Sequence, residues 1–324
     1  MSFKYYTPRL IVSKCLGFCN CRFDGSVLNS QTIEMLKPFA EINTVCPETE
    51  IGLPTPREAL RLIRANNEEE IRLVLSYSGN DYTEKMKEYS KEVLSRFGEV
   101  DGFILKNRSP SCGTRDVKVY PSAGKVMIKD EKSSGIFAEQ AMQIFPNSLF
   151  EDDGRLTNFV IREHFLTSIF ALAHWRNVKS SNEHKELVQF HSEYKYLFMT
   201  FHQDTLSKMG KVVANQNKLS FQEVVQQYET LLNLILRHTP DPGKNINVLQ
   251  HIFGYFSKHL QEPEKVLFLE MIEMYRKGRI PLSVPRFLLT SYARRFDEEY
   301  IANQRFFAPY PEELITISDS GKGR

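Results

Sequence analysis

The chain of 324 residues is long enough for about two domains of ordinary size, each with its own core. Its apolar fraction of 41%, charged fraction of 25% and formal net charge of +2 are those of a globular protein and give no overall argument for a nucleic-acid partner. No apolar run reaches the roughly 18 residues of a membrane span, and the N-terminus has no secretory pattern, so a cytoplasmic protein without a membrane partner is expected.

Cysteine and histidine residues are segregated along the chain. All five cysteines lie within the first 112 residues, and all eight histidines lie after residue 160. An odd number of thiols in a chain of this class argues against a disulfide framework and favours metal or redox chemistry. Because a cysteine site would find no histidine in its own half, the sequence predicts two domains with different chemistry, at residues 1–150 and 151–324.

In chain order, the first domain alternates strand-like apolar runs with helix-like segments. Strands are expected at residues 10–15, 42–46, 71–75 and 102–105, followed by a hairpin at 117–120 and 125–128. Helices are expected at residues 31–39, 56–64, 83–97 and 136–144. Strands that alternate with helices are typical of a largely parallel sheet with helices on its faces, so an α/β fold is predicted for this domain.

The second domain begins after an acidic break at residues 151–154, which ends on a glycine. From residue 155 onward nearly every segment has a helical period, and helices are expected at 156–178, 184–209, 220–238, 245–261, 264–278 and 285–302. The second domain is therefore predicted to be all-α.

Three of the cysteines stand at the ends of predicted strands. Cys15 and Cys46 end two strands, and Cys112 lies in the turn that follows a third. Ligands bind at the carboxyl ends of the strands in open α/β sheets, so these thiols are expected to form one site. Three converging thiolates suit an iron–sulfur cluster with one open iron, or a zinc ion with an open position. Inert buried cysteines and a redox dithiol are the alternatives.

Three segments in order closely resemble the thiouracil desulfidase (TudS) family. They are residues 12–17 with 21–25 (VSKCLG and CRFDG), residues 46–48 with 52–57 (CPE and GLPTPR), and residues 106–113 (KNRSPSCG). The helical half resembles the YbgA-type domain of unknown function, through residues 278–285 (GRIPLSVP) and the later Tyr292, Arg294 and Arg295. The fusion of the two domains resembles the bacterial tRNA 4-thiouridine desulfidase family, and the resemblance covers almost the whole chain.

The resemblance implies a 4Fe–4S cluster held by Cys15, Cys46 and Cys112, with one iron free of protein to bind the sulfur of the substrate. The implied reaction is the non-redox desulfuration of 4-thiouridine in tRNA to uridine. Cys21 lies within a family segment, so an exchange with Cys15 as a ligand stays open, whereas Cys19 is expected to be incidental.

Glu48 is the best candidate for the general base, because its carboxylate lies two residues from a cluster ligand at a strand end. An N-cap or an ion pair with Arg57 is the alternative role for this side chain. Ser109 and Ser111 are candidates for the proton donor or hydrogen-bond partner of the leaving sulfur. Ser109 is favoured, since Ser111 beside the ligand could simply bond to the backbone of the turn.

Basic residues interleaved with aromatic residues in the helical half suggest a surface for RNA. The candidates are His191, Lys195, His202, Lys208, Lys211, Arg294 and Arg295. The first three have the spacing of one helix face. An ordinary solvated face, with the arginines in salt bridges, is the alternative.

The sequence leaves other functions open. The substrate could be a free thiolated nucleobase such as thiouracil, the protein could be an iron–sulfur RNA-binding regulator without turnover, or the cysteines could hold a structural zinc ion. A tRNA desulfidase is the favoured prediction, because an enzyme for a free base would need no second domain.

Overall fold

The computed structural model describes residues 3–64, 70–124 and 131–320. The chain forms two compact units, and neither is continuous in sequence. The sheet unit contains Thr7–Ile169 and the segment from Glu313, and the helical unit contains Phe170–Glu312 and the segment up to Tyr6. The division falls inside helix α5 (Phe159–Ser181). The expected domain boundary at residues 150 and 151 stays a prediction.

The first sheet of the sheet unit is entirely parallel. Its strand order is β2 (Glu41–Val45), β1 (Arg9–Ser13), β5 (Gly102–Leu105) and β8 (Leu149–Asp152). β1 and β5 form the centre of the sheet and consist almost wholly of buried apolar residues, as expected for strands covered on both faces. β8 was not predicted, because its sequence (LFED) ends in the acidic run that was interpreted as a break.

A second sheet is mixed, in the order β4 (Arg72–Leu75), β3 (Leu60–Ile63), β6 (Val117–Tyr120) and β7 (Lys132–Ser133). The helix predicted at residues 56–64 is wrong, because β3 occupies this segment. Leu60 and Leu62 are both buried, so the two-residue period of a strand prevails over the helical propensity of the residues before it. The second strand of the predicted hairpin, at 125–128, lies outside the described residues, and β6 pairs instead with β7.

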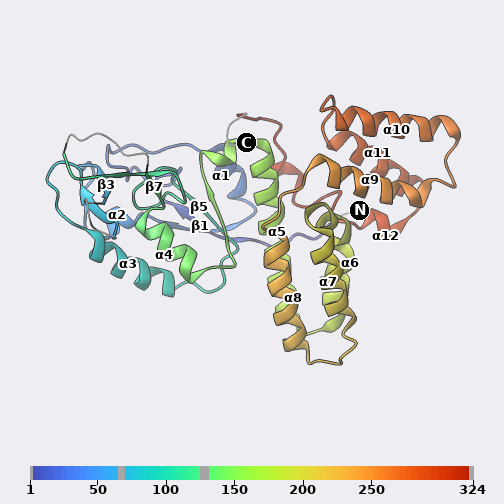
Figure 1. Cartoon of the computed structure of the whole chain (residues 1–324), viewed down its shortest axis with the longest axis horizontal. Helices are drawn as coiled ribbons and strands as arrows, with labels where there is room; N and C mark the ends of the chain where they lie inside the picture. The colour runs from blue at the N-terminus through green and yellow to red at the C-terminus, as the bar shows by residue number, and fades with distance from the viewer. Residues whose placement is uncertain (1–2, 65–69, 125–130, 321–324) are drawn as a thin grey trace. The chain divides into compact units, whose positions relative to one another are not determined.

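Among the described residues, the helices between the strands of this unit are α1 (Gln31–Leu36), α2 (Pro47–Glu50), α3 (Thr83–Ser95) and α4 (Ile136–Ile144). α3 and α4 pack side by side (Figure 1). Their buried side chains, Met86 and Phe137 among them, form one core with Ile11, Phe103 and Leu105 of the central strands. The α/β fold predicted for the first domain is confirmed.

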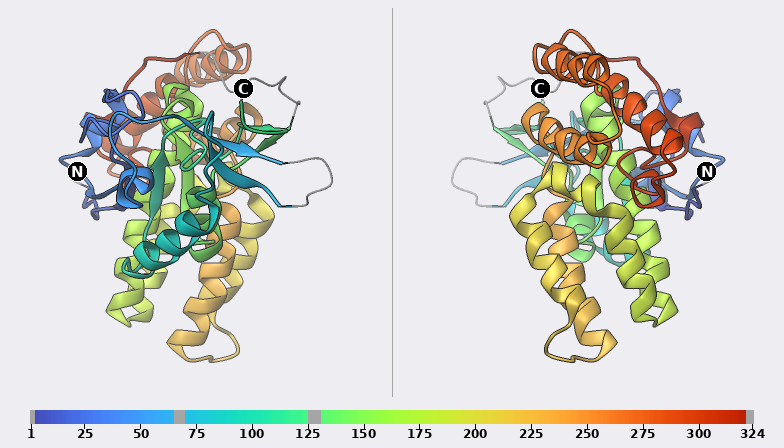
Figure 2. Two further views of the ribbon diagram at one scale, coloured as in Figure 1. Left: turned by 90° about the vertical axis from the view of Figure 1, so that its left-hand side faces the viewer. Right: turned by 90° about the vertical axis from the view of Figure 1, so that its right-hand side faces the viewer.

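After β8 the described residues form only helices and loops, which confirms the predicted all-α half. The later helices are α6 (His184–Phe201), α7 (Gln203–Ala214), α8 (Phe221–Ile235), α9 (Pro242–Phe256), α10 (Glu262–Arg276), α11 (Ser283–Arg295) and α12 (Glu299–Ala302). α7 and α8 lie side by side (Figure 2). Of the helices described, none is both long and apolar enough to cross a membrane.

Two predicted helices of this half are each divided into two. The segment 184–209 breaks at His202, whose backbone is extended and whose ring accepts a hydrogen bond from the amide of Thr205. His202 is thus the N-cap of α7. The segment 285–302 breaks at Asp297, which has a left-handed φ of 54° between α11 and α12.

Candidate active site

The three predicted ligand cysteines line one cavity of about 270 Å³ at the carboxyl ends of β1, β2 and β5. The register explains this, because Ser13 of β1 pairs with Val45 of β2 and Val12 with Ile104 of β5, so the three strands end close together. Cys46 directly follows β2, and Cys15 lies two residues beyond β1. Cys21 and Glu48 line the same cavity, and Cys19 is exposed and does not.

Cys112 lies seven residues beyond β5, so the loop that carries it needs separate support. The first turn of α4 provides it. The amide of Ile136 donates to the carbonyl of Pro110 at 3.2 Å, and the amide of Phe137 donates to the carbonyl of Ser111 at 3.0 Å. These amides are among those that a helix leaves unpaired at its N-terminus, so the loop and the helix satisfy each other.

Gly135, which precedes α4, permits this close approach. A Cβ atom added there would lie 2.5 Å from the backbone carbon and oxygen of Ser111. We expect Gly135→Ala to lower the free energy of unfolding by about 1–3 kcal/mol and to reduce iron uptake by displacing Cys112. Gly98→Ala is the matched control, since no heavy atom lies within 4 Å of its added Cβ. Thermal unfolding and iron analysis test this, and an alanine variant as stable and iron-rich as the control would contradict it.

Three thiols of the cavity, those of Cys15, Cys21 and Cys112, have raised pKa values. Burial, and then the neighbouring Cys46, raise the pKa of Cys15 from 9.0 to about 12. Burial also raises the pKa of Cys112 well above its usual value, although a hydrogen bond with Ser13 opposes this. The pKa of Cys21 is raised by burial and by Cys46. Thiolates are therefore costly here without a cation, and a bound metal would release protons on binding.

The raised pKa of Cys15 predicts how the metal-free protein responds to pH. A folded-state pKa above the unfolded value favours the folded state below pH 9, and this contribution is lost as the pH rises from 9 toward about 12. We expect the free energy of unfolding to fall over this range by more in the parent protein than in Cys15→Ser. Urea unfolding below and above pH 9 measures the difference, and equal losses in both proteins would refute the prediction.

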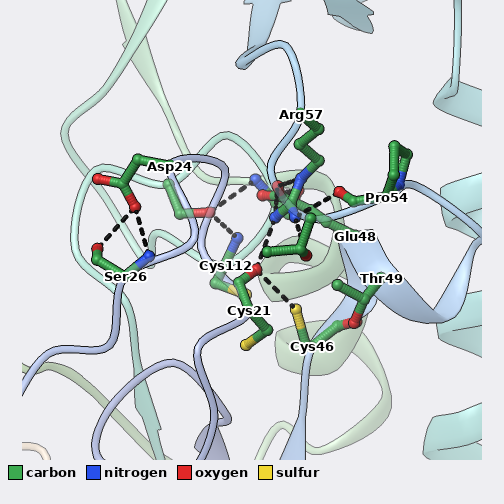
Figure 3. Close-up of polar contacts among 12 residues, drawn as sticks. Cys21, Asp24, Ser26, Cys46, Glu48, Thr49, Pro54, Arg57 and Cys112 are labelled. Carbon is green, nitrogen blue, oxygen red and sulfur yellow. Dashed lines mark hydrogen bonds and ion pairs between the residues drawn. The ribbon is translucent and has the colours of Figure 1, made fainter.

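Glu48 belongs to α2 and is held from two sides. Arg57 donates to one carboxylate oxygen, Oε2, from Nε at 3.0 Å and from Nη2 at 2.6 Å (Figure 3). The hydroxyl of Ser111 donates to the other oxygen, Oε1, at 3.0 Å. The side chains of Arg57 and Glu48 are only 3% and 14% exposed. Glu48 is thus both a residue of the cavity wall and the partner of Arg57.

The two candidate serines have different contacts. The hydroxyl of Ser111 binds Glu48 and not the backbone of the turn, and Ser111 does not line the cavity. The hydroxyl oxygen of Ser109 accepts hydrogen bonds from the amides of Ser111 at 3.2 Å and Cys112 at 3.1 Å. Ser109 lines the cavity, and its hydroxyl proton is left to donate to a ligand there.

Sequence reasoning missed several polar residues of the cavity. Ser13 is buried, accepts a hydrogen bond from the amide of Lys106 at 2.9 Å and interacts with the thiol of Cys112. Lys106 pairs with Asp153 at 2.9 Å. Their position was a usable signal, because Ser13 is the last residue of β1 and Lys106 directly follows β5.

The two histidines proposed for RNA binding have structural partners. His191 contacts the hydroxyl of Tyr228 at 3.1 Å, and burial lowers its pKa to about 4. His202 caps α7, and its ring stacks on His238 with centroids 4.4 Å apart. Lys195 of α6 is half-buried, and its ammonium group lies over the ring of Tyr196. His202 therefore lies beyond the end of α6 and does not share a helix face with His191 and Lys195.

The remaining basic candidates lie on the surface of the helical unit. Lys208 and Lys211 are exposed on α7, and Arg294 and Arg295 are exposed in the last turn of α11. Arg295 forms an ion pair with Glu264 at 2.7 Å, which is the alternative role expected for the arginines.

Comparisons with known proteins assign each half separately. Residues 10–153 match the family model described as 2-thiouracil desulfurase, and residues 195–311 match the model of a protein family of unknown function, DUF1722. The uncharacterized protein YbgA of Escherichia coli (strain K12) is 29% identical over 158 residues, which are 48% of this chain and 93% of YbgA. The uncharacterized protein YbbK of Bacillus subtilis (strain 168) is 28% identical over 148 residues, which are 44% of this chain and 98% of YbbK.

Among solved structures, the 4Fe-4S-dependent thiouracil desulfidase TudS is 23% identical and matches with a TM-score of 0.36, over 46% of this chain and 93% of that one. The two family models match the two parts of the chain that carry the predicted motifs, namely the cysteine segments and the segment around residues 278–285. The chain thus joins an N-terminal domain of the 2-thiouracil desulfurase family to a C-terminal DUF1722 domain of the YbgA type.

Proposed function

We propose that this protein removes the sulfur of 4-thiouridine in tRNA, using a 4Fe–4S cluster bound by Cys15, Cys46 and Cys112. The observation that carries the proposal is that these three thiols and the carboxylate of Glu48 line one cavity, in a domain that matches the 2-thiouracil desulfurase family. Desulfuration of a thiolated nucleobase is the activity that the family indicates, and the tRNA substrate and the chemistry below are our proposals.

The donor set of the cavity fits an iron–sulfur cluster, since cysteine thiolates are the usual ligands of such clusters. Each cysteine of a cluster binds a different iron, so three thiols that line one cavity match the ligand set of a cluster with one open iron. When bound, the cluster would supply a soft Lewis acid for the thiocarbonyl sulfur.

In this proposal Glu48 takes a proton from the water that attacks the thiolated carbon. The carbon–oxygen bond forms as the carbon–sulfur bond breaks, so thiocarbonyl and water become carbonyl and hydrogen sulfide with no net change of oxidation state. Arg57 and Ser111 fix the orientation of the carboxylate, because Arg57 binds Oε2 and Ser111 binds Oε1. Burial of the carboxylate keeps competing water from it. Ser109, whose hydroxyl proton is available in the cavity, would donate to the departing sulfur.

The case for tRNA rests on the exposed cations of the helical unit. Lys208 and Lys211 lie one turn apart on α7, where both can contact phosphate groups. We expect the double substitution Lys208→Glu and Lys211→Glu to lower sulfide release from thiolated tRNA by roughly 10-fold relative to release from 4-thiouracil. The matched control is Lys91→Glu with Lys118→Glu, which reverses two exposed charges of the sheet unit. An equal loss on both substrates would favour the free base as the natural substrate.

The direct test of the proposed function is anaerobic reconstitution with iron and sulfide, followed by incubation with tRNA that contains 4-thiouridine. Loss of the thiouridine absorbance together with release of sulfide would support it. Release from 4-thiouracil alone would keep the site and change the substrate. A protein that binds iron stoichiometrically yet releases no sulfide from either substrate would instead be a non-catalytic iron–sulfur protein.

A further inference from the structure

Ser13 is a polar residue in the buried part of β1, where the other residues are apolar. It is the last residue of the strand, follows Leu10, Ile11 and Val12, and is 1% exposed. A hydroxyl group that is shielded from water costs free energy unless it is hydrogen-bonded. The oxygen of Ser13 accepts from the amide of Lys106 at 2.9 Å, which joins the end of β1 to the residue that follows β5.

The hydroxyl proton of Ser13 is directed to the sulfur of Cys112. The two residues line the same cavity, and their side chains are hydrogen-bonded. This bond lowers the pKa of Cys112 against the larger rise that burial causes, which is the effect of a donor on a thiolate. Because the Ser13 oxygen already accepts from the amide of Lys106, donation to sulfur uses the proton that is left.

The position of Ser13 is fixed, whereas the loop of Cys112 is held only through its backbone contacts. The carbonyl of Ser13 accepts from the amide of Leu16 at 2.9 Å, so the serine lies between a central strand and a hydrogen-bonded turn. The contacts of the Cys112 loop with Ser109 and with the first turn of α4 involve backbone groups of the loop. The hydrogen bond from Ser13 therefore adds a contact that acts on the sulfur itself.

We propose that Ser13 is a positioning residue for the cluster, because its hydroxyl group holds the sulfur of Cys112 and withdraws electron density from it. A hydrogen bond to a ligand sulfur stabilises the thiolate that binds iron, and it raises the reduction potential of an iron–sulfur cluster. The inference rests on the proposed function, because it assigns this role toward the cluster of the same cavity.

The test compares the reconstituted full-length parent protein with Ser13→Ala under anaerobic conditions. We expect the variant to lose iron at a roughly 10-fold lower concentration of a ferrous chelator, and to have a more negative reduction potential. Ser13→Thr keeps the hydroxyl group on a side chain suited to a strand, so it should restore most of both properties.

Ser90→Ala is the matched control and should change neither property. Ser90 of α3 is also fully buried, its hydroxyl donates to the carbonyl of Met86 at 2.6 Å, and it does not line the cavity. The control therefore measures the effect of deleting a buried, hydrogen-bonded hydroxyl elsewhere in the same unit.

A vibrational measurement separates the hydrogen bond from a merely structural effect. The hydroxyl proton exchanges in heavy water, so the iron–sulfur vibrations of the parent protein should shift there by more than those of Ser13→Ala. Equal potentials and equal isotope shifts would overturn the proposal even if Ser13→Ala unfolds at a lower temperature, since Ser13 would then only join β1 to β5. If the parent binds a cluster and releases sulfide, that failure concerns Ser13 alone. A parent protein that takes up no iron would overturn the proposed function and this inference together.

Discussion

Replacing Cys46 with alanine is expected to reduce both bound iron and sulfide release to background, a loss of more than about 100-fold in activity. Cys46 directly follows β2, and its thiol lies 3.8 Å from the carbonyl of Cys21, so its position is set by a strand end and by the neighbouring loop. The same loss is expected for Cys15→Ala and Cys112→Ala. Iron and sulfide per chain, with the visible absorbance of the cluster, provide the measurement.

The remaining cysteines supply the controls for this experiment. Cys19 is exposed and does not line the cavity, so Cys19→Ala should bind a full complement of iron. Cys21 lines the cavity and is buried, so Cys21→Ala decides whether it exchanges with Cys15. Full iron and activity in Cys15→Ala, combined with their loss in Cys21→Ala, would move the first ligand to Cys21. Full iron in all three single variants of the proposed ligands would refute the cluster site.

Glu48→Gln should lower the rate of desulfuration by roughly 10²- to 10⁴-fold while iron content stays unchanged. Glutamine has the same length as glutamate and keeps an oxygen that can accept from Arg57, but it cannot take a proton from water. Rates under single-turnover conditions, normalised to bound cluster, isolate the chemical step from cluster loading.

The control for Glu48 is Glu41→Gln, which removes an exposed carboxylate on β2 and should leave both rate and iron content unchanged. Ser111→Ala removes only the hydrogen bond to Oε1, so its loss of rate should be smaller than that of Glu48→Gln. A Glu48→Gln protein that retains half of the parent rate would exclude Glu48 as the base. A variant that loses iron as well would instead show that the carboxylate supports the loop of Cys46.

The convergence of the three cysteines was predictable from local sequence, because each follows an apolar strand and parallel strands end at a common edge. The support of the Cys112 loop was not, since it depends on amides of α4, more than twenty residues later in the chain, and on the absence of a side chain at Gly135. The sequence predicted a helix at residues 56–64, and pairing with β4 and β6 makes residues 60–63 a strand.

The roles of the polar residues were harder to predict than their presence. The sequence suggests Glu48 and Arg57 as possible partners. It does not show which of the hydroxyls of Ser109 and Ser111 binds an oxygen of the Glu48 carboxylate. Only the three-dimensional arrangement shows that Ser111 reaches Glu48 and that Ser109 holds the backbone. Similarly, His191 and His202 looked accessible by helical spacing, and tertiary packing against Tyr228 and His238 occupies them.

Each of the two units includes a segment from the opposite end of the chain, which affects how the protein can be divided into fragments. Arg162 in the sheet unit donates to the carbonyls of Thr316 and Ser318, and Arg305 in the helical unit donates to the carbonyl of Lys4. A single cut near residue 150 would therefore separate Lys4 from Arg305, and it would leave residues 151–169 and the segment from Glu313, which belong to the sheet unit, on the helical fragment. Fragments for separate study would need those segments reattached by short linkers, as in a circularly permuted chain.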